Sequence, residues 1–423
     1  MKQQKSFEFV VLGCGQRGQL FADWLHEHPE AGRVVAVAEP RADRREIVAK
    51  QHAVPPDMQF ERWEQVLERP RLADAAINTL MDRLHAPSAI KALDAGYHML
   101  LEKPMATTVE DCIAIDAARR RNKRIVSVCH SLRYHRCYAE VKRLLDAGEI
   151  GALVSFDQVE CVDPVHQAHS FVRGNWGVEG KSAFMLLAKS CHDIDLVAYM
   201  VGKPCLRVSS FGHRSHFRKE QAPAGAPMRC TDGCPVEVDC PYSAYKVYVE
   251  NSPYANLIGL HRHTRDERLK FIHEAPYGRC AYRCDNDVVD HQVVNFEFAD
   301  HITGTFTMTA FAPGGRQMRL HGTHGYITAD PGTNTITLKR FWGTGTRETI
   351  VIPPQVGGHG GGDDNTMKCF VQAMRTNDPK AVLTTTEESL RTHTITFAAE
   401  LARKECRVVE VSELTRPIRK RRK

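Results

Sequence analysis

The feature that most restricts the fold lies at the start of the chain, where a strand-like run, FEFVVLG, meets a glycine-rich turn. A helical pattern, RGQLFADWLHEH, follows at once. The turn consists of Gly13, Gly15 and Gly18, with Gln16 and Arg17 between them. Glycines permit a tight turn and close approach of the backbone to a pyrophosphate, whose charge the helix N-terminus attracts. Strand, turn and helix in this order predict a dinucleotide-binding unit, with these five residues at the cofactor.

An acidic residue at the end of the second strand-like run, RVVAVAE, indicates which dinucleotide this is. Glu39 lies 21 residues after Gly18, the spacing at which a carboxylate receives the hydroxyls of the adenosine ribose. A carboxylate also repels a 2′-phosphate, so the sequence predicts NAD as cofactor. Arg41 and Arg44 follow closely and would soften that repulsion.

The pattern of apolar residues divides the chain into an α/β part and an α+β part. Residues 1–130 alternate strand-like and helical segments, which predicts a Rossmann domain with a doubly wound parallel sheet. Residues 131–410 carry strand patterns of period two, which predict a large open, mainly antiparallel sheet. We expect this second domain to bind substrate and to form oligomers. It contains a Cys-rich insert at about 204–290, and a basic tail follows at 411–423.

Composition excludes several classes of partner. No apolar run approaches the roughly 20 residues of a membrane helix, and no signal-peptide core precedes the first strand, so we expect a cytoplasmic protein without a membrane partner. Six of the last nine residues are Lys or Arg, which accounts for the whole formal charge of +6. A basic end of this kind is more often solvated than bound to polyanions, so no nucleic-acid partner is predicted.

Titratable residues gather on one apolar segment, LLAKSCHDID. Lys189 and His192 are one helical turn apart on one face, which is the arrangement of a pair that points into an active site. The structural alternative is an ordinary surface pair between Lys189 and Asp193. Asp193 and Asp195 are expected to orient neighbouring groups.

Several motifs together resemble the glucose–fructose oxidoreductase/inositol dehydrogenase/rhizopine-catabolism (Gfo/Idh/MocA) family over essentially the whole chain. They are the glycine turn, NTLMDRLHAP, GYHMLLEKP, SLRY and HDIDL. The resemblance implies that Lys103 lies between the nicotinamide and the sugar hydroxyl as a catalytic or polarising group, and that Glu102 orients it and the nicotinamide ribose. It implies too that Thr79 and His85 line the cofactor cleft. It also implies hydride transfer at a ring carbon of a sugar or cyclitol, and a homodimer or homotetramer formed through the open sheet.

The chain departs from this family on the helix that carries His192. The typical dehydrogenase has an aspartate four residues before the histidine, whereas this chain has Ala188, followed by Lys189. His192 remains suited to act as a general base near neutral pH. Lys189 would hold an anion, stabilise an alkoxide, or act as a base if burial lowers its pKa. Tyr134, of the SLRY motif, completes the predicted catalytic set.

Three functions stay open at this point. The first is an NAD-dependent oxidoreductase that acts on a pyranose sugar, glycoside or cyclitol, with C3 as the expected carbon. The second is a redox-neutral NAD-dependent glycosidase, which oxidises, eliminates, adds water and reduces, and whose substrate is an anionic sugar such as a sulfoquinovoside. The third is a non-catalytic NAD-binding regulator, which would need neither Lys103 nor His192.

The loop HQAHSFVRGNWGVEGKSAF precedes this helix and supplies an aromatic platform and several cations, as a sugar pocket requires. A solvated basic loop is the alternative. Asp285, Asn286, His359 and Asp363 are further candidates at the border of the substrate. The residues predicted to bind substrate are His166, His169, Arg173, Trp176, Lys181 and Asp287.

Cysteines concentrate in the insert, in RCTDGCPVEVDCPYSAY and YGRCAYRCDND. Cys230 and Cys234 have a spacing used in structural zinc sites, and Gly and Pro between the cysteines allow thiolates to converge. With Cys240, and Cys280 or Cys284 as the fourth ligand, they predict a structural Zn²⁺ that pins an insert with little core of its own. The alternative is reduced, unliganded thiols.

Overall fold

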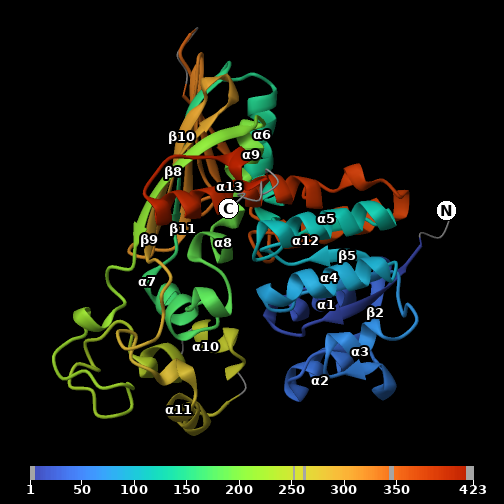
Figure 1. Cartoon of the computed structure of the whole chain (residues 1–423), viewed down its shortest axis with the longest axis vertical. Coiled ribbons are helices and arrows are strands. Elements are labelled where there is room, and N and C mark those ends of the chain that lie inside the picture. The colour runs from blue at the N-terminus through green and yellow to red at the C-terminus, as the bar shows by residue number, and fades with distance from the viewer. Residues whose placement is uncertain (1–4, 251–252, 261–262, 343–346, 416–423) are drawn as a thin grey trace, which may run out of the picture.

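The computed structural model describes residues 5–250, 253–260, 263–342 and 347–415, so most of the basic tail lies outside the described residues. Two sheets form the frame of the molecule (Figure 1). The parallel sheet lies among helices α1 to α5, and the larger sheet stands beside it with the insert below. None of the helices in these ranges is long and apolar enough to cross a membrane.

The N-terminal sheet has six parallel strands in the order β3-β2-β1-β4-β5-β6. This order places the end of β1 at the point where the chain switches from one side of the sheet to the other, which is where such folds bind ligands. Strands and helices of this half are β1 (Phe7–Leu12), α1 (Gln16–Glu27), β2 (Gly32–Ala38), α2 (Ala42–Gln51), β3 (Gln59–Phe60), α3 (Trp63–Leu67), β4 (Ala75–Asn78), α4 (His85–Asp94), β5 (His98–Leu101), α5 (Val109–Asn122) and β6 (Val126–Val128).

The second sheet has nine strands in the order β14-β13-β12-β11-β7-β10-β9-β8-β15, and only β7 and β10 pair in parallel. Its strands alternate buried and exposed residues, because helices cover one face alone. The strands are β7 (Leu153–Cys161), β8 (Cys205–His213), β9 (His291–Phe298), β10 (Thr303–Thr309), β11 (Gly315–Gly322), β12 (Gly325–Asp330), β13 (Thr335–Arg340), β14 (Arg347–Val351) and β15 (Val409–Glu410). The predicted fold class, a Rossmann sheet followed by a large open sheet, is confirmed.

The second half also contains helices, of which α10 and α11 lie in the insert. The helices are α6 (Arg136–Asp146), α7 (Pro164–His166), α8 (Met185–Ala188), α9 (Cys191–Val201), α10 (Pro253–Leu257), α11 (Arg265–Glu274), α12 (Gly362–Thr376) and α13 (Thr386–Glu405). Helix α12 returns to the first half, where Met367 and Phe370 share a core with Phe9 and Phe21. A boundary at residue 130 therefore leaves out a helix that completes the Rossmann half, because the apolar face of α12 has its partner there.

Candidate functional site

The glycine turn after β1 has the shape that a dinucleotide needs. Gly13 adopts φ +91°, and a Cβ atom on Gly18 would lie 2.0 Å from the Gly13 carbonyl oxygen, so both positions require glycine. A Cβ atom on Gly15 would instead meet only an Arg44 nitrogen, at 3.8 Å, which leaves open space beside the backbone. Helix α1 begins at Gln16 and directs its free N–H groups to this space. The turn therefore fits a pyrophosphate.

Glu39 and Thr79 border this turn. One Glu39 carboxylate oxygen accepts the Cys14 N–H at 2.9 Å and the other accepts the Arg41 N–H at 3.1 Å, so the backbone fixes the carboxylate at the end of β2. The Thr79 hydroxyl donates to the Gly13 carbonyl at 2.6 Å and ties β4 to the turn. These contacts hold both side chains against the glycine turn.

His85 has a different place from the one expected of a residue lining the cleft. Its Nδ1 lies 2.7 Å from the Pro104 carbonyl oxygen and its Nε2 2.9 Å from that of Leu80, and the residue is 1% exposed. Both ring nitrogens therefore bond to backbone carbonyls and join the loops 79–85 and 102–105.

A buried network joins the cofactor turn to the C-terminal half. Arg17 donates to Glu102 at 2.6 Å and to both oxygens of Asp363 at 2.8 Å. Asp363 also accepts from Ser131 and from His359 Nδ1, the latter at 2.9 Å. Burial acts to raise the pKa of Asp363, but the hydrogen bonds from Arg17 and His359 outweigh it, so this pKa lies well below its usual range.

His359 itself has a backbone conformation that residues with a side chain rarely adopt. Its φ is +50°, within a run of glycines, so a glycine or asparagine would be less strained there. The imidazole ring lies 5.2 Å from that of His192, centroid to centroid. The strained position thus places an imidazole between Asp363 and His192.

Lys103 and His192 meet where the two halves of the molecule face each other. The Lys103 ammonium donates to the Ala188 carbonyl at 2.8 Å, and among the described residues no carboxylate lies within 4 Å of it. His192 is 3% exposed and neither ring nitrogen has a partner in the described residues. Burial, and then the positive charge of Lys103, hold the pKa of His192 well below its usual range. Buried polar atoms are normally paired, so the free nitrogens mark a place for a ligand.

Lys189 belongs to a second buried cluster beside this pair. Its ammonium lies 2.9 Å from one oxygen of Glu160, and Arg316 lies 2.7 Å from the other oxygen and 2.8 Å from Asp193. The surface pair between Lys189 and Asp193 is therefore not formed, because Arg316 takes the aspartate. Burial lowers the pKa of Lys189, and the charge of Glu160 opposes that effect. Two carboxylates thus balance two cations.

Tyr134 does not contact these groups in the structure, so its predicted catalytic role is corrected here to a structural one. Its hydroxyl is 3.2 Å from the Thr384 hydroxyl and accepts the Leu383 N–H at 2.9 Å, and burial raises its pKa to about 12. The phenol is committed to packing the segment before α13. Asp195 orients a neighbour as expected, since Arg133 donates to both of its oxygens at 2.7 and 2.8 Å.

Of the six residues predicted to bind substrate, only His166 lies near the lysines. Burial, and then the positive charge of Lys189, lower its pKa to about 3. His169 and Arg173 face the insert: His169 bonds the Tyr248 hydroxyl at 3.0 Å, and Arg173 donates to two backbone carbonyls and is 2% exposed. Both side chains are therefore bonded to groups of the insert.

The other three hold loops together. The Trp176 indole N–H donates to Asp82 at 3.1 Å. Lys181 pairs with Asp285 at 3.1 Å, and Asp287 accepts the Glu179 N–H at 2.8 Å. The Trp176 indole N–H and one Asp287 oxygen are thus bonded within the protein, whereas the Lys181 side chain is 71% exposed and pairs at the surface.

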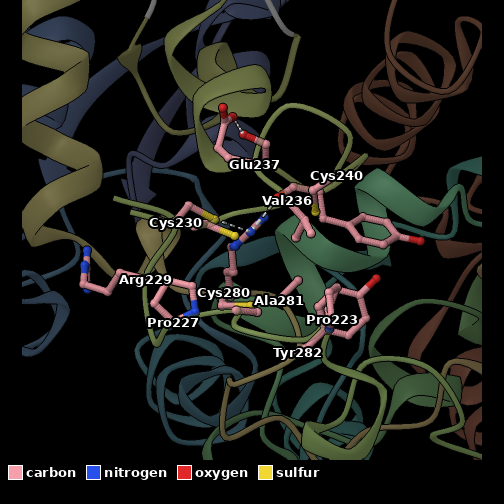
Figure 2. Close-up of a pocket in the computed structure, with 15 residues that line it drawn as sticks. Pro223, Pro227, Arg229, Cys230, Val236, Glu237, Cys240, Cys280, Ala281 and Tyr282 are labelled. Atoms are coloured by element: carbon pink, nitrogen blue, oxygen red, sulfur yellow. Dashed lines mark hydrogen bonds between the residues drawn. The ribbon is translucent and has the colours of Figure 1, made fainter. Parts of the chain in front are cut away.

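The cysteines of the insert gather without forming a metal site. Figure 2 shows Cys230, Cys240 and Cys280 on the wall of one small pocket, which Cys234 also lines. The Arg173 guanidinium enters this group and lies 3.8 Å from the Cys230 sulfur. In the described ranges, no three Cys, His, Asp or Glu side chains are placed to hold a metal ion. The expected zinc site is therefore not supported by the described residues.

Several residues of the site were not found from the sequence. Glu160 and Gln158 occupy buried positions of β7. Polar residues on the buried face of an alternating strand could have indicated from the sequence that these two belong to the site. His130, whose ring lies 5.8 Å from that of His192, also belongs to the site. Asp82, His130 and Arg316 carried no comparable pattern, because their partners come from segments far away in the chain.

Comparison with known proteins agrees with this geometry. Residues 7–130 match the oxidoreductase family with an NAD-binding Rossmann fold, and residues 138–328 match the GFO/IDH/MocA C-terminal domain. The putative oxidoreductase YteT of Bacillus subtilis is 24% identical over 73% of this chain and 74% of its own length. The NAD⁺-dependent scyllo-inositol 2-dehydrogenase of the same organism is 28% identical over 48% of this chain and 56% of its own.

Solved structures share the fold. A levoglucosan dehydrogenase, solved with NADH and levoglucosan, superposes with a TM-score of 0.72 at 17% identity and covers 96% of this chain and 100% of its own. The scyllo-inositol dehydrogenase of Lactobacillus casei, solved with NAD(H) and scyllo-inositol, has a TM-score of 0.67 at 17% identity over 96% and 100%. The chain therefore belongs to the Gfo/Idh/MocA family of NAD-binding oxidoreductases.

Proposed function

We propose that the protein is an NAD-dependent dehydrogenase that oxidises a ring carbon, with C3 as the expected position, of a pyranose sugar, glycoside or cyclitol. The observation that carries the proposal is the meeting of Lys103, from the Rossmann half, with the segment that bears Ala188 and His192, from the other half. Relatives named as inositol dehydrogenases and a levoglucosan dehydrogenase of the same fold support the substrate class.

Each residue has a role that its surroundings support. The bound NAD supplies the hydride acceptor. Lys103 carries an ammonium with no carboxylate partner in the described residues, so it is available to stabilise an alkoxide. His192 is held in its neutral form with unpaired nitrogens and accepts the hydroxyl proton. His359, oriented by Asp363, lies behind it as a further proton-accepting group.

A second candidate is the redox-neutral glycosidase, and Lys189 favours it. An oxidised C3 acidifies the C2 proton, and elimination of the C1 substituent then requires a base beside the one that serves C3. Lys189 is buried near His166 and its pKa is lowered, which are properties of a lysine that can lose its proton. Because Glu160 and Asp193 balance Lys189 and Arg316, a sulfonate on the substrate would be met by the Lys103 ammonium, which has no carboxylate partner in the described residues.

The experiment that separates the two candidates follows absorbance at 340 nm and aglycone release together. The panel contains nitrophenyl glycosides, both neutral and anionic, free sugars and inositols, each with added NAD. Accumulation of NADH without aglycone release supports the dehydrogenase. NAD-dependent aglycone release without net NADH supports the glycosidase. NAD binding without either reaction over the whole panel would contradict both enzymatic functions and would favour the non-catalytic NAD-binding regulator.

We further propose that the protein forms a homo-oligomer through the open face of the nine-stranded sheet. The Phe211 side chain of β8 is exposed there at 62%, beside its register partner Val293 of β9. Light scattering coupled to gel filtration should give a mass of two or four chains, and Phe211→Glu should lower it; a monomeric wild type would contradict the assignment.

A further inference from the structure

We propose that His359 is the exit of a proton relay, which passes the hydroxyl proton from the enclosed His192 to solvent. The relay rests on the proposed function, in which His192 removes this proton, and adds the route by which the proton leaves. When the ring carbon is oxidised, its C–H bond gives a hydride to the nicotinamide and its O–H bond gives a proton to His192. One proton per turnover must therefore leave the site.

His192 has no direct way to release a proton to water. The residue is 3% exposed, and both of its ring nitrogens are buried without a partner in the described residues. The groups whose positive charge acts on this ring are Lys103, His359, His130 and Arg316. An ammonium and a guanidinium already carry their protons, so only the two histidines of this set can accept another one.

The two neighbouring histidines differ in their access to solvent. The His130 ring lies 5.8 Å from that of His192, centroid to centroid, but the residue is 0% exposed, so a proton placed there is no closer to water. The His359 ring lies at 5.2 Å, and its side chain is 30% exposed. The rings of His192 and His359 are not hydrogen-bonded to each other, and at this separation one water molecule bridges their nitrogens. His359 is thus the neighbour through which the proton reaches solvent.

Asp363 prepares His359 for this task. Its carboxylate lies 2.9 Å from Nδ1 of the imidazole. Burial acts to raise the pKa of Asp363, but the hydrogen bonds from Arg17 and His359 hold it well below its usual range, so the group stays ionised. An ionised carboxylate only accepts hydrogen bonds, which places the hydrogen on Nδ1 and leaves Nε2 to accept a proton. The same carboxylate stabilises the imidazolium that then forms.

The backbone of the loop is a separate observation that singles out His359. Its φ is +50°, and Gly357, Gly360 and Gly361 beside it also have positive φ. A Cβ atom on Gly360 would lie 2.4 Å from the Nε2 atom of His135, so a side chain is excluded there. The loop therefore presents a single imidazole among glycines, at a position where the side chain strains the backbone.

Chemical labelling of the wild-type protein tests the two histidines without a substrate. Diethylpyrocarbonate modifies unprotonated imidazoles that solvent can reach, and peptide mass spectrometry locates each modified ring. His359 should be modified well before His192, because its side chain is 30% exposed and His192 is enclosed. Equal rates for the two rings would overturn the relay, since His192 would then exchange protons with water by itself.

Replacement of His359 by glycine tests the proton transfer. Glycine adopts a φ of +50° without strain, so His359→Gly should fold, and the space that it leaves admits imidazole from solution. On the fastest substrate of the glycoside, sugar and inositol panel, kcat should fall about 10²-fold. Added imidazole should restore most of this loss, in proportion to its unprotonated fraction between about pH 6 and 8. The dissociation constant for NAD should not change.

Matched variants separate proton transfer from an effect on the structure. His359→Asn also tolerates a positive φ, but its amide is no base and occupies part of the space, so imidazole should not restore its kcat. Lys123→Gly relieves a similar φ, +51°, at the exposed end of α5 and should keep the wild-type rate with or without imidazole.

The outcomes for the relay and for the proposed function are distinct. A His359→Gly enzyme with wild-type kcat, or a loss that imidazole does not restore, would overturn the relay and leave a dehydrogenase intact. A wild-type protein that is inactive over the whole panel would overturn the proposed function instead.

Discussion

At the scale of single residues, the site depends on which charges are left without partners. Arg17, Arg316 and Lys189 are each paired with carboxylates, whereas the Lys103 ammonium has only a carbonyl oxygen in the described residues. A cation of this kind, in a water-poor cleft, is strongly attracted to negative charge that develops on a substrate oxygen.

Replacement of Lys103 tests this role. Lys103→Met should lower kcat by about 10²- to 10⁴-fold, because the alkoxide loses its charge partner. The dissociation constant for NAD should change little, since the glycine turn and Glu39 carry most of the contacts. Stopped-flow rates and NAD titration by fluorescence measure the two quantities. Lys91→Met, on the surface of α4, is the control; a Lys103→Met enzyme with wild-type kcat would refute the assignment.

Lys189 permits a prediction that distinguishes the two proposed reactions. If it is the base at C2, Lys189→Met should still form NADH on the enzyme from a glycoside but should lose aglycone release and the exchange of the C2 hydrogen with D₂O. If it only positions substrate, both half-reactions should slow together through a higher KM. Mass spectrometry of recovered substrate measures the exchange of the C2 hydrogen, and the burst of absorbance at 340 nm measures NADH formed on the enzyme.

At the scale of elements, a buried ion pair joins three segments far apart in the sequence. Arg133, in the turn before α6, donates to both oxygens of Asp195 on α9, and Thr392 on α13 donates to the same carboxylate at 3.0 Å. Both charged side chains are at most 2% exposed. The pair thus fixes how α9, which carries His192, sits against the C-terminal helix.

Breaking this pair on one side should be costly. Asp195→Asn removes the nearer of the two carboxylates beside the buried Arg133 guanidinium and leaves it only the 40% exposed Glu388 at 3.4 Å. The change should reduce the free energy of unfolding by about 3–5 kcal/mol. Glu140→Gln, which breaks the exposed pair with Arg143 on α6, should cost less than about 1 kcal/mol. Urea unfolding followed by circular dichroism compares the two, and equal midpoints would show that the buried pair does not support the fold.

At the scale of the whole molecule, buried histidines make stability depend on pH. Burial is the main reason that the pKa of His393 is lowered to about 3 and that of His169 to about 4. In the unfolded chain both would have a pKa near 6.5, so between about pH 4 and 6.5 the unfolded state binds more protons. Stability is therefore complete above this window and falls as the pH is lowered through it.

Two such histidines should give a slope of about 3 kcal/mol per pH unit at the lower end of the window. Denaturant midpoints measured from pH 7.5 to 4.5 test this, and His393→Gln, whose side-chain oxygen can still accept the Met105 N–H that Nε2 now accepts, should flatten the slope. Midpoints that stay constant down to pH 5 would show that these rings are protonated in the folded state.

Local pattern was enough to determine the parallel sheet, the glycine turn, Glu39 and the helix of His192, because each depends on residues close together in the sequence. Strand, turn and helix in succession have few other ways to pack. The alternating strands of the second half likewise predicted an open sheet.

Tertiary structure alone decided which side chains meet. Asp82 with Trp176, Arg17 with Asp363, and Lys189 with Glu160 are pairs from segments that no local period connects. The thiols of the insert were predicted to bind zinc from their spacing, yet a buried arginine from a distant turn enters their pocket. Which side chains contact each other depends on how whole elements pack and on the need to compensate every buried charge. Neither can be predicted from the spacing of residues within a motif.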